Sequence, residues 1–136
     1  MSSLFTVLDV SGSALDAQSK RMNMIASNLA NAESATSSTG EPYKARQVVF
    51  AALPVDPKQP HVMGVRVTAI VEDQSPPRLR YEPGNPLADA KGFVTLPNVN
   101  LPEQMADMIS ASRSYQASIE VTNTTKQMIQ QAIRMI

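Results

Sequence analysis

Few side chains in this sequence have the type and spacing that catalysis or metal binding requires. His61 is the only histidine, and in "KQPHVMG" it lies between turn-forming residues without a second ligand nearby, so we interpret it as a surface-loop residue. Glu72 and Asp73 are adjacent at the end of an expected strand, where neighbouring side chains project to opposite sides. Spacing alone leaves a glycosidase-type carboxylate pair open, but nothing in the sequence favours one.

Other catalytic signatures are missing from the sequence. There is no cysteine, no Gly-x-Ser-x-Gly elbow and no glycine-rich phosphate loop. The sequence therefore predicts that the protein is not an enzyme and uses no cofactor and no metal. Twelve basic residues balance twelve acidic ones, so no net charge argues for nucleic acid as a partner.

Two asparagines, Asn28 and Asn31, stand out in "MIASNLANAES" because they interrupt an alanine-rich helical pattern. We interpret them as contact residues and not as reactive groups. Asn28 lies beside the apolar stripe, where it can hydrogen-bond to a neighbouring helix and set its register. Asn31 is placed to help end the helix, because its side chain competes for backbone groups. A solvated side chain is the alternative at each position.

The prolines determine which elements carry these residues. All ten prolines lie in residues 42–102, and the flanking segments have none. Because proline interrupts helices, the sequence predicts three parts: an N-terminal helix with its loop (1–41), a proline-rich β insert (42–102) and a C-terminal helix (103–136). No apolar run in the first helix is long enough for a signal peptide or a membrane span, so we expect no membrane insertion.

Both flanks carry a seven-residue apolar repeat. Gly12 weakens the first helix, so we expect residues 14–31 to be more regular than those before them. Asn100 is expected to cap the last helix, with Pro102 in its first turn. The repeat and the two asparagines together predict these helix-packing or subunit-interface residues: Leu8, Leu15, Met22, Ile25, Asn28, Leu29, Asn31, Met105, Met108, Tyr115, Ile119, Ile129, Ile133 and Ile136.

The middle segment contains short β-branched runs at residues 46–53, 65–71, 78–82 and 92–96. Pro83 and Gly84 suit the central positions of a type II turn. With so few large apolar residues, this module is expected to lean on the helices or on neighbouring chains. The predicted fold is mainly α with a small β insert, in which the two terminal helices pair as an antiparallel coiled coil.

Three stretches resemble the bacterial flagellar basal-body rod proteins. They are "SGSALDAQSKRMNMIASNLANAES", "YEPGNPLADAKGFVTLPNVN" and "MISASRSYQASIEVTNTTKQM". The helical stretches are similar to the wider rod and hook family, whereas "YEPGNPLADAKG" is similar to the proximal rod proteins. Many relatives have a Thr-Pro-Gly-Tyr turn after the first helix, but this chain has a serine-rich loop, "ESATSSTGEPYKAR".

The resemblance implies a structural subunit that polymerises through its terminal helices into the rod, the drive shaft that passes torque from the membrane ring to the hook. It implies export without a cleaved signal peptide by the flagellar type III apparatus and assembly in the periplasm. The implied partners are other copies of the chain, the rod proteins FlgB, FlgF and FlgG, and the adapter FliE. The alternatives are a peptidoglycan-associated binding module, with the β insert as its active part, and a coiled-coil adapter.

Overall fold

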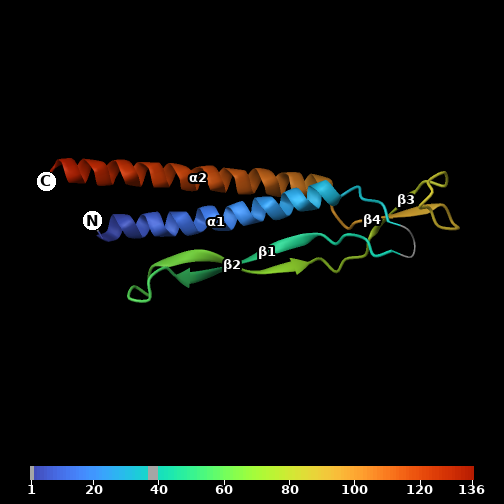
Figure 1. Ribbon diagram of the computed structural model, residues 1–136, viewed down its shortest axis with the longest axis horizontal. Helices are drawn as coiled ribbons and strands as arrows, with labels where there is room; N and C mark the ends of the chain where they lie inside the picture. The colour runs from blue at the N-terminus through green and yellow to red at the C-terminus, as the bar shows by residue number, and fades with distance from the viewer. Residues whose placement is uncertain (1, 37–39) are drawn as a thin grey trace.

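The structure is a computed structural model that describes residues 2–36 and 40–136. Residues 37–39 of the serine-rich loop lie outside the described part. The molecule is elongated, with two long helices side by side (Figure 1). The elements in chain order are α1 (Ser2–Asn31), β1 (Arg46–Pro54), β2 (Met63–Glu72), β3 (Arg78–Tyr81), β4 (Phe93–Leu96) and α2 (Leu101–Arg134).

The helices run antiparallel, and α1 lies between α2 and the β1–β2 hairpin (Figure 1). The direction follows from two contacts, because Asn28 meets Gln104 whereas the earlier Arg21 meets the later Asp107. The described residues therefore confirm a mainly helical fold in which long helices flank a small β region. The β3–β4 hairpin lies beyond the end of the helix pair.

Local sequence signals explain where the helices begin and end. Asn100 has extended backbone angles, and its side chain accepts a hydrogen bond from the Glu103 amide at 3.3 Å, so the predicted cap of α2 is confirmed. Pro102 lies in the first turn, where its missing donor costs no helical hydrogen bond. The helix α1 is continuous through Gly12, so the expectation of a less regular start was wrong. Packing against α2 and β2 supports this segment despite its glycine.

The strands form two antiparallel hairpins within the described residues. In the first, Arg46 pairs with Glu72 and Pro54 with Met63, with a register shift between Val49 and Phe50. In the second, Arg78 pairs with Leu96 and Tyr81 with Phe93. All four predicted strand segments are confirmed, although β2 begins two residues earlier than expected.

The connection between β3 and β4 differs from the predicted turn type. Asn85 donates its amide to the Glu82 carbonyl at 3.0 Å, so a turn is present at Pro83 and Gly84. A type II turn needs a positive φ at the third residue, however, and among the described residues Gly92 alone has one, at 86°. Side-chain bonds from Asn85 to Glu82 and to the Leu87 amide stabilise this other geometry.

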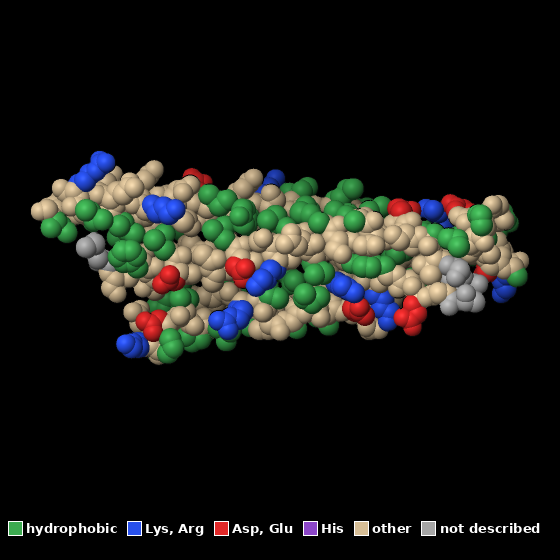
Figure 2. Space-filling model, viewed as in Figure 1, with side chains coloured by type: hydrophobic (Ala, Val, Ile, Leu, Met, Phe, Trp, Pro, Cys, Tyr) green, Lys and Arg blue, Asp and Glu red, His purple; other side chains and the backbone are tan. Residues whose placement is uncertain are grey.

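The buried core is small for a chain of this length. Ala32, Ala45 and Val99 form one cluster, with Tyr43 and Leu101 packed against it. By contrast, many large apolar side chains are exposed, and Figure 2 shows hydrophobic groups along the helices and the hairpin. Single exposed apolar residues are ordinary, but groups of them indicate surfaces that another molecule covers.

The buried face of α2 predicts the effect of a substitution at Ala111, which has 0% exposure. Ala111→Leu adds volume where α2 packs on α1, so we expect it to lower the free energy of unfolding by about 1–3 kcal/mol. Chemical denaturation of the purified chain measures this.

Ile109→Leu is the matched control, because Ile109 is 56% exposed on the same helix. Its effect should stay within about 0.5 kcal/mol. Equal stability of Ala111→Leu and the unmodified chain would contradict the packing of α2 described above.

Candidate functional site

Asn28 is the point at which α1, α2 and β1 meet. It is 1% exposed. Its Nδ2 donates to the Arg46 carbonyl at 2.8 Å and to Oε1 of Gln104 at 3.0 Å. Its Oδ1 accepts from the Tyr43 hydroxyl and the Arg46 amide, both at 2.9 Å. An amide side chain has two donor hydrogens and an oxygen with two lone pairs, so every position is used.

Asn28, the three residues that it bonds and the neighbouring buried cluster form what we call the Asn28 junction. It contains Ser27, Asn28, Ala32, Tyr43, Ala45, Arg46, Asn98, Val99 and Gln104. Asn98, in the segment just before α2, connects the junction to the residues that flank the first hairpin. Its Oδ1 accepts from the Ala45 amide at 2.8 Å, and its Nδ2 donates to the carbonyls of Asp73 and Ser75. Both ends of the β1–β2 hairpin are thereby held near the end of the helix pair.

Asn31 has a local role. Its Nδ2 donates to the Ser27 carbonyl at 2.8 Å, one turn earlier, and its own carbonyl accepts from the Ser34 amide at 3.1 Å. The helix α1 ends at Asn31. The bond from Ser34 satisfies a carbonyl group that the last turn of a helix otherwise leaves open. The two asparagines of the motif therefore have different partners.

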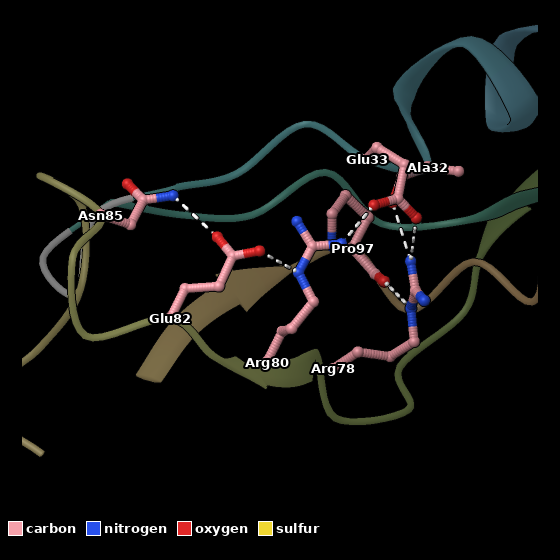
Figure 3. Close-up of polar contacts among 7 residues, drawn as sticks. All are labelled: Ala32, Glu33, Arg78, Arg80, Glu82, Asn85 and Pro97. Carbon is pink, nitrogen blue, oxygen red and sulfur yellow. Dashed lines mark hydrogen bonds and ion pairs between the residues drawn. The ribbon is translucent and has the colours of Figure 1, made fainter. Parts of the chain in front are cut away.

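Arginine side chains connect the β3–β4 hairpin to the end of α1 (Figure 3). Arg78 donates from Nη2 to the Ala32 carbonyl at 2.8 Å and from Nε to the Pro97 carbonyl at 2.9 Å. Arg80 pairs through Nη1 with Glu33 at 2.7 Å. Because a guanidinium offers several donors in a fixed plane, one side chain can link two backbone segments.

The network continues outward along β3. Arg80 Nε contacts Oε1 of Glu82 at 2.8 Å, and Asn85 donates to the other oxygen of Glu82 at 3.0 Å (Figure 3). The hydrogen bond from Arg80 lowers the pKa of Glu33, and the same bond raises the pKa of Arg80. The charges thus orient the hairpin relative to α1, in a solvated setting where each pair contributes little to stability.

The predicted interface residues divide into two groups by exposure. The first group is buried or half-buried: Leu8, Leu15, Met22, Ile25, Asn28, Leu29, Asn31, Met108, Tyr115 and Ile129. The second group is exposed: Met105 at 56%, Ile119 at 38%, Ile133 at 56% and Ile136 at 93%. The structure brings the first group to the packed side of the helices, whereas the second group points to solvent. Whether the second group forms subunit contacts stays a prediction.

The row of α2 that faces α1 was missed in the sequence. It lies one residue before the row through Met105 and contains Gln104, Ala111, Ser118, Thr125 and Ala132, each buried or half-buried. Small and polar residues give a weak hydropathy signal, so the larger apolar side chains of the next row dominated the pattern. The seven-residue spacing of the small and polar residues was the one sequence signal that could have identified this row. Thr125 satisfies its buried hydroxyl by donating to the Val121 carbonyl at 2.7 Å.

The side chains considered for catalysis are exposed to solvent or bonded to neighbouring residues. His61 is exposed, and Glu72 pairs with Arg46 at 3.5 Å. Asp73 accepts hydrogen bonds from the amide and hydroxyl of Ser75, which lower the pKa of Asp73. Within residues 2–36 and 40–136, no group of three or more histidine and acidic side chains is placed to hold a metal ion. Neither described helix combines the length and apolarity needed to cross a membrane.

Comparison with known families matches both helical ends of the chain. Residues 8–35 match the family described as "Flagella basal body rod protein". Residues 90–135 match "Flagellar basal body rod FlgEFG protein C-terminal". The first match spans most of α1, including Asn28, and the second includes β4 and all of α2.

Individual relatives cover almost the whole chain. The flagellar basal-body rod protein FlgC of Yersinia enterocolitica is 54% identical over 127 residues, covering 93% of each chain. FlgC of Salmonella typhimurium is 55% identical over 126 residues, 93% of this chain and 92% of the relative. FlgC of Borreliella burgdorferi is 38% identical over 148 residues, 98% and 97% of the two chains.

The junction predicts that Asn28→Ala strongly destabilises the folded chain. The change leaves the amide and carbonyl of Arg46 and the side chain of Gln104 without partners, and each unsatisfied buried group costs about 1–3 kcal/mol. We expect the free energy of unfolding to fall by about 3 kcal/mol in chemical denaturation. Asn23→Ala, an exposed change on the same helix, is the control and should have little effect. Similar losses for both variants would refute the role of the junction.

The network at β3 predicts a change in titration. The pKa of Glu33 is lower in the folded chain than in the unfolded chain. The ionised carboxylate therefore stabilises the fold at pH values above the pKa that Glu33 has when unfolded, and this stabilisation is lost as the pH falls through its folded pKa. Arg80→Gln removes the largest cause, so we expect the pKa of Glu33 to rise in an NMR titration of its carboxyl carbon. Arg46→Gln, remote from Glu33, should leave that pKa unchanged. An unaltered Glu33 titration in Arg80→Gln would contradict the pairing.

Proposed function

This chain belongs to the family of flagellar basal-body rod proteins, and we propose that it builds its part of the rod through the two helices joined at the Asn28 junction. It is a structural subunit of the rod and not an enzyme. It is located in the flagellar basal body, where it assembles with other rod components.

The observation that carries the proposal is the placement of apolar side chains on α2. Small residues such as Ala111 face α1, whereas Met105, Ile109 and Ile119 are 56%, 56% and 38% exposed. Burying apolar area drives association, at about 25 cal/mol per Å² removed from water. A helix that leaves several large apolar side chains exposed is suited to a partner on that face. This supports contacts between α2 and neighbouring subunits.

We propose that the two helices pair as an antiparallel coiled coil and polymerise into the rod. The seven-residue spacing of the buried α2 row supports this arrangement. In this proposal residues 1–41 and 103–136 form the axial part, and residues 42–102 form lateral contacts. A paired helix resists bending better than a single one, so such subunits suit a drive shaft that transmits torque to the hook.

The individual binding partners of the chain and its route of export are also proposals. We propose contacts with further copies of the chain, with FlgB, FlgF and FlgG, and with FliE. We propose export by the flagellar type III apparatus without a cleaved signal peptide, followed by assembly in the periplasm. The small core supports export in an unfolded form, because a chain with little buried apolar area unfolds at modest cost.

Removing residues 129–136 tests the proposal. Ile129 is a buried residue of α2, whereas Ile133, Met135 and Ile136 are exposed at 56%, 87% and 93%. In cells that lack the native gene, we expect the truncated chain to be synthesised but not incorporated into purified basal bodies, with loss of motility.

A matched control replaces Gln130, an exposed polar residue of the same segment, by alanine and should retain motility. Immunoblots of whole cells and of basal bodies separate failed synthesis from failed assembly. Normal incorporation of the truncated chain would refute the proposed role of this segment of α2.

A further inference from the structure

A groove of about 440 Å³ lies where the start of α1 meets the β1–β2 connection and α2. Val10 is half-buried in it, and Val7 and Val121 are 40% and 47% exposed. None of the residues that line it is charged. They are Ser3, Thr6, Val7, Val10, Ser11, Gln59, Val62 and Val121. An open, uncharged groove with valine walls suits an apolar side chain.

Phe5 projects from the other side of the same helix segment. It is 53% exposed. At about 100° per residue, Val7 and Val10 lie about 200° and 140° round the helix from Phe5. The aromatic ring therefore points away from the groove of its own chain, although both lie at the same level along α1. A side-by-side neighbour would bring one to the other without displacement along the long axis.

Gly12 adds an independent observation on the Phe5 side. It lies seven residues after Phe5, so both are on one stripe of the helix. A Cβ added at Gly12 meets no atom within 4 Å, and the φ of Gly12 is not positive, so nothing in the described part of the chain requires glycine there. Glycine is unfavourable inside a helix. Its presence here is explained if another chain approaches this stripe closely.

Charge complementarity supports the same pairing. Asp9, four residues after Phe5, is exposed on the stripe, with Gly12 one turn further on. Lys58 is exposed beside Gln59, which lines the groove. When Phe5 approaches the groove of a neighbour, an acidic residue accompanies it and a basic residue borders the site.

From these observations we propose that Phe5 of one copy inserts into this groove on a second copy, with Gly12 allowing close approach and Asp9 near Lys58. The inference rests on the proposed function, since it identifies the partner of the helix pair as the same chain. The contact is heterologous: one copy presents the stripe and the next presents the groove. Such a contact repeats around an axis and gives a ring or a helix, as a rod requires.

Cysteine cross-linking tests the contact, because the chain has no cysteine of its own. Cells would produce two copies of the full chain, one with Phe5→Cys and one with Val62→Cys, and purified basal bodies would be treated with a mild oxidant. We expect a disulfide-linked pair at twice the chain mass. Asp9→Cys with Lys58→Cys is a second pair, for the case that loss of Phe5 prevents assembly.

The control pair is Phe5→Cys with Leu79→Cys, since Leu79 is 63% exposed on β3 and should give no adduct. Adducts of Phe5→Cys with itself or with a different protein, or rods without any adduct from either pair, would overturn the proposal while leaving the role as a rod subunit intact. Absence of the unmodified chain from basal bodies would instead refute the proposed function, and this contact with it.

Gly12→Ala is expected to change two measured quantities in opposite directions: the stability of the free chain and the yield of the cross-link. Alanine favours the helix, so the free chain should gain helicity and thermal stability. The added methyl group should obstruct the neighbour and reduce the cross-link yield several-fold. An unchanged yield would overturn the role assigned to Gly12.

Discussion

The fold depends on one buried amide. Asn28 is 1% exposed, so each of its donors and acceptors needs a protein partner. Those partners lie in two separate segments of the chain: Tyr43 and Arg46 at the start of the β1–β2 hairpin, and Gln104 in α2. Its bond to Gln104 determines which residues of α1 and α2 face each other. Its paired bonds to the Arg46 backbone determine where β1 starts. A sliding helix or a shifted strand would leave buried polar groups unsatisfied, so this residue enforces one arrangement where the apolar contacts alone are few.

The distribution of side-chain size follows from the same arrangement. Small and hydroxyl-bearing residues, among them Ser11, Ala111 and Thr125, occupy much of the buried face of the helices, and several larger apolar residues remain exposed. The single chain therefore buries little apolar area relative to its length. A subunit of this kind gains much of its stability when neighbours cover the exposed surfaces, which suits a protein that functions only within an assembly. The β3–β4 hairpin, held by exposed charges and two arginine bonds to backbone carbonyls, is the part most separate from the helices.

Much of the fold was predictable because its signals are local. Proline removes backbone donors, so the absence of proline in both flanks indicated the helices, and Asn100 with Pro102 indicated the start of α2. The exposed row of α2 was harder to assign. Met105 and Ile119 resemble core residues by type, but the side of a helix that faces its partner depends on the partner, and α1 accepts small residues there. The turn at Gly84 depended on side-chain bonds from Asn85, which spacing does not reveal.

By itself, the sequence determined the helix, insert and helix order, the strand segments, and the resemblance to rod proteins, because propensities, caps and motifs act over a few residues. It also indicated that the asparagines of "MIASNLANAES" make contacts. Only the tertiary structure decided which contacts: Asn28 joins Gln104, Tyr43 and Arg46, whereas Asn31 bonds within its own helix. The partners of Asn28 lie 15 to 76 positions away along the chain. Hydrogen bonds over such separations arise from the path of the whole chain, which no local pattern specifies.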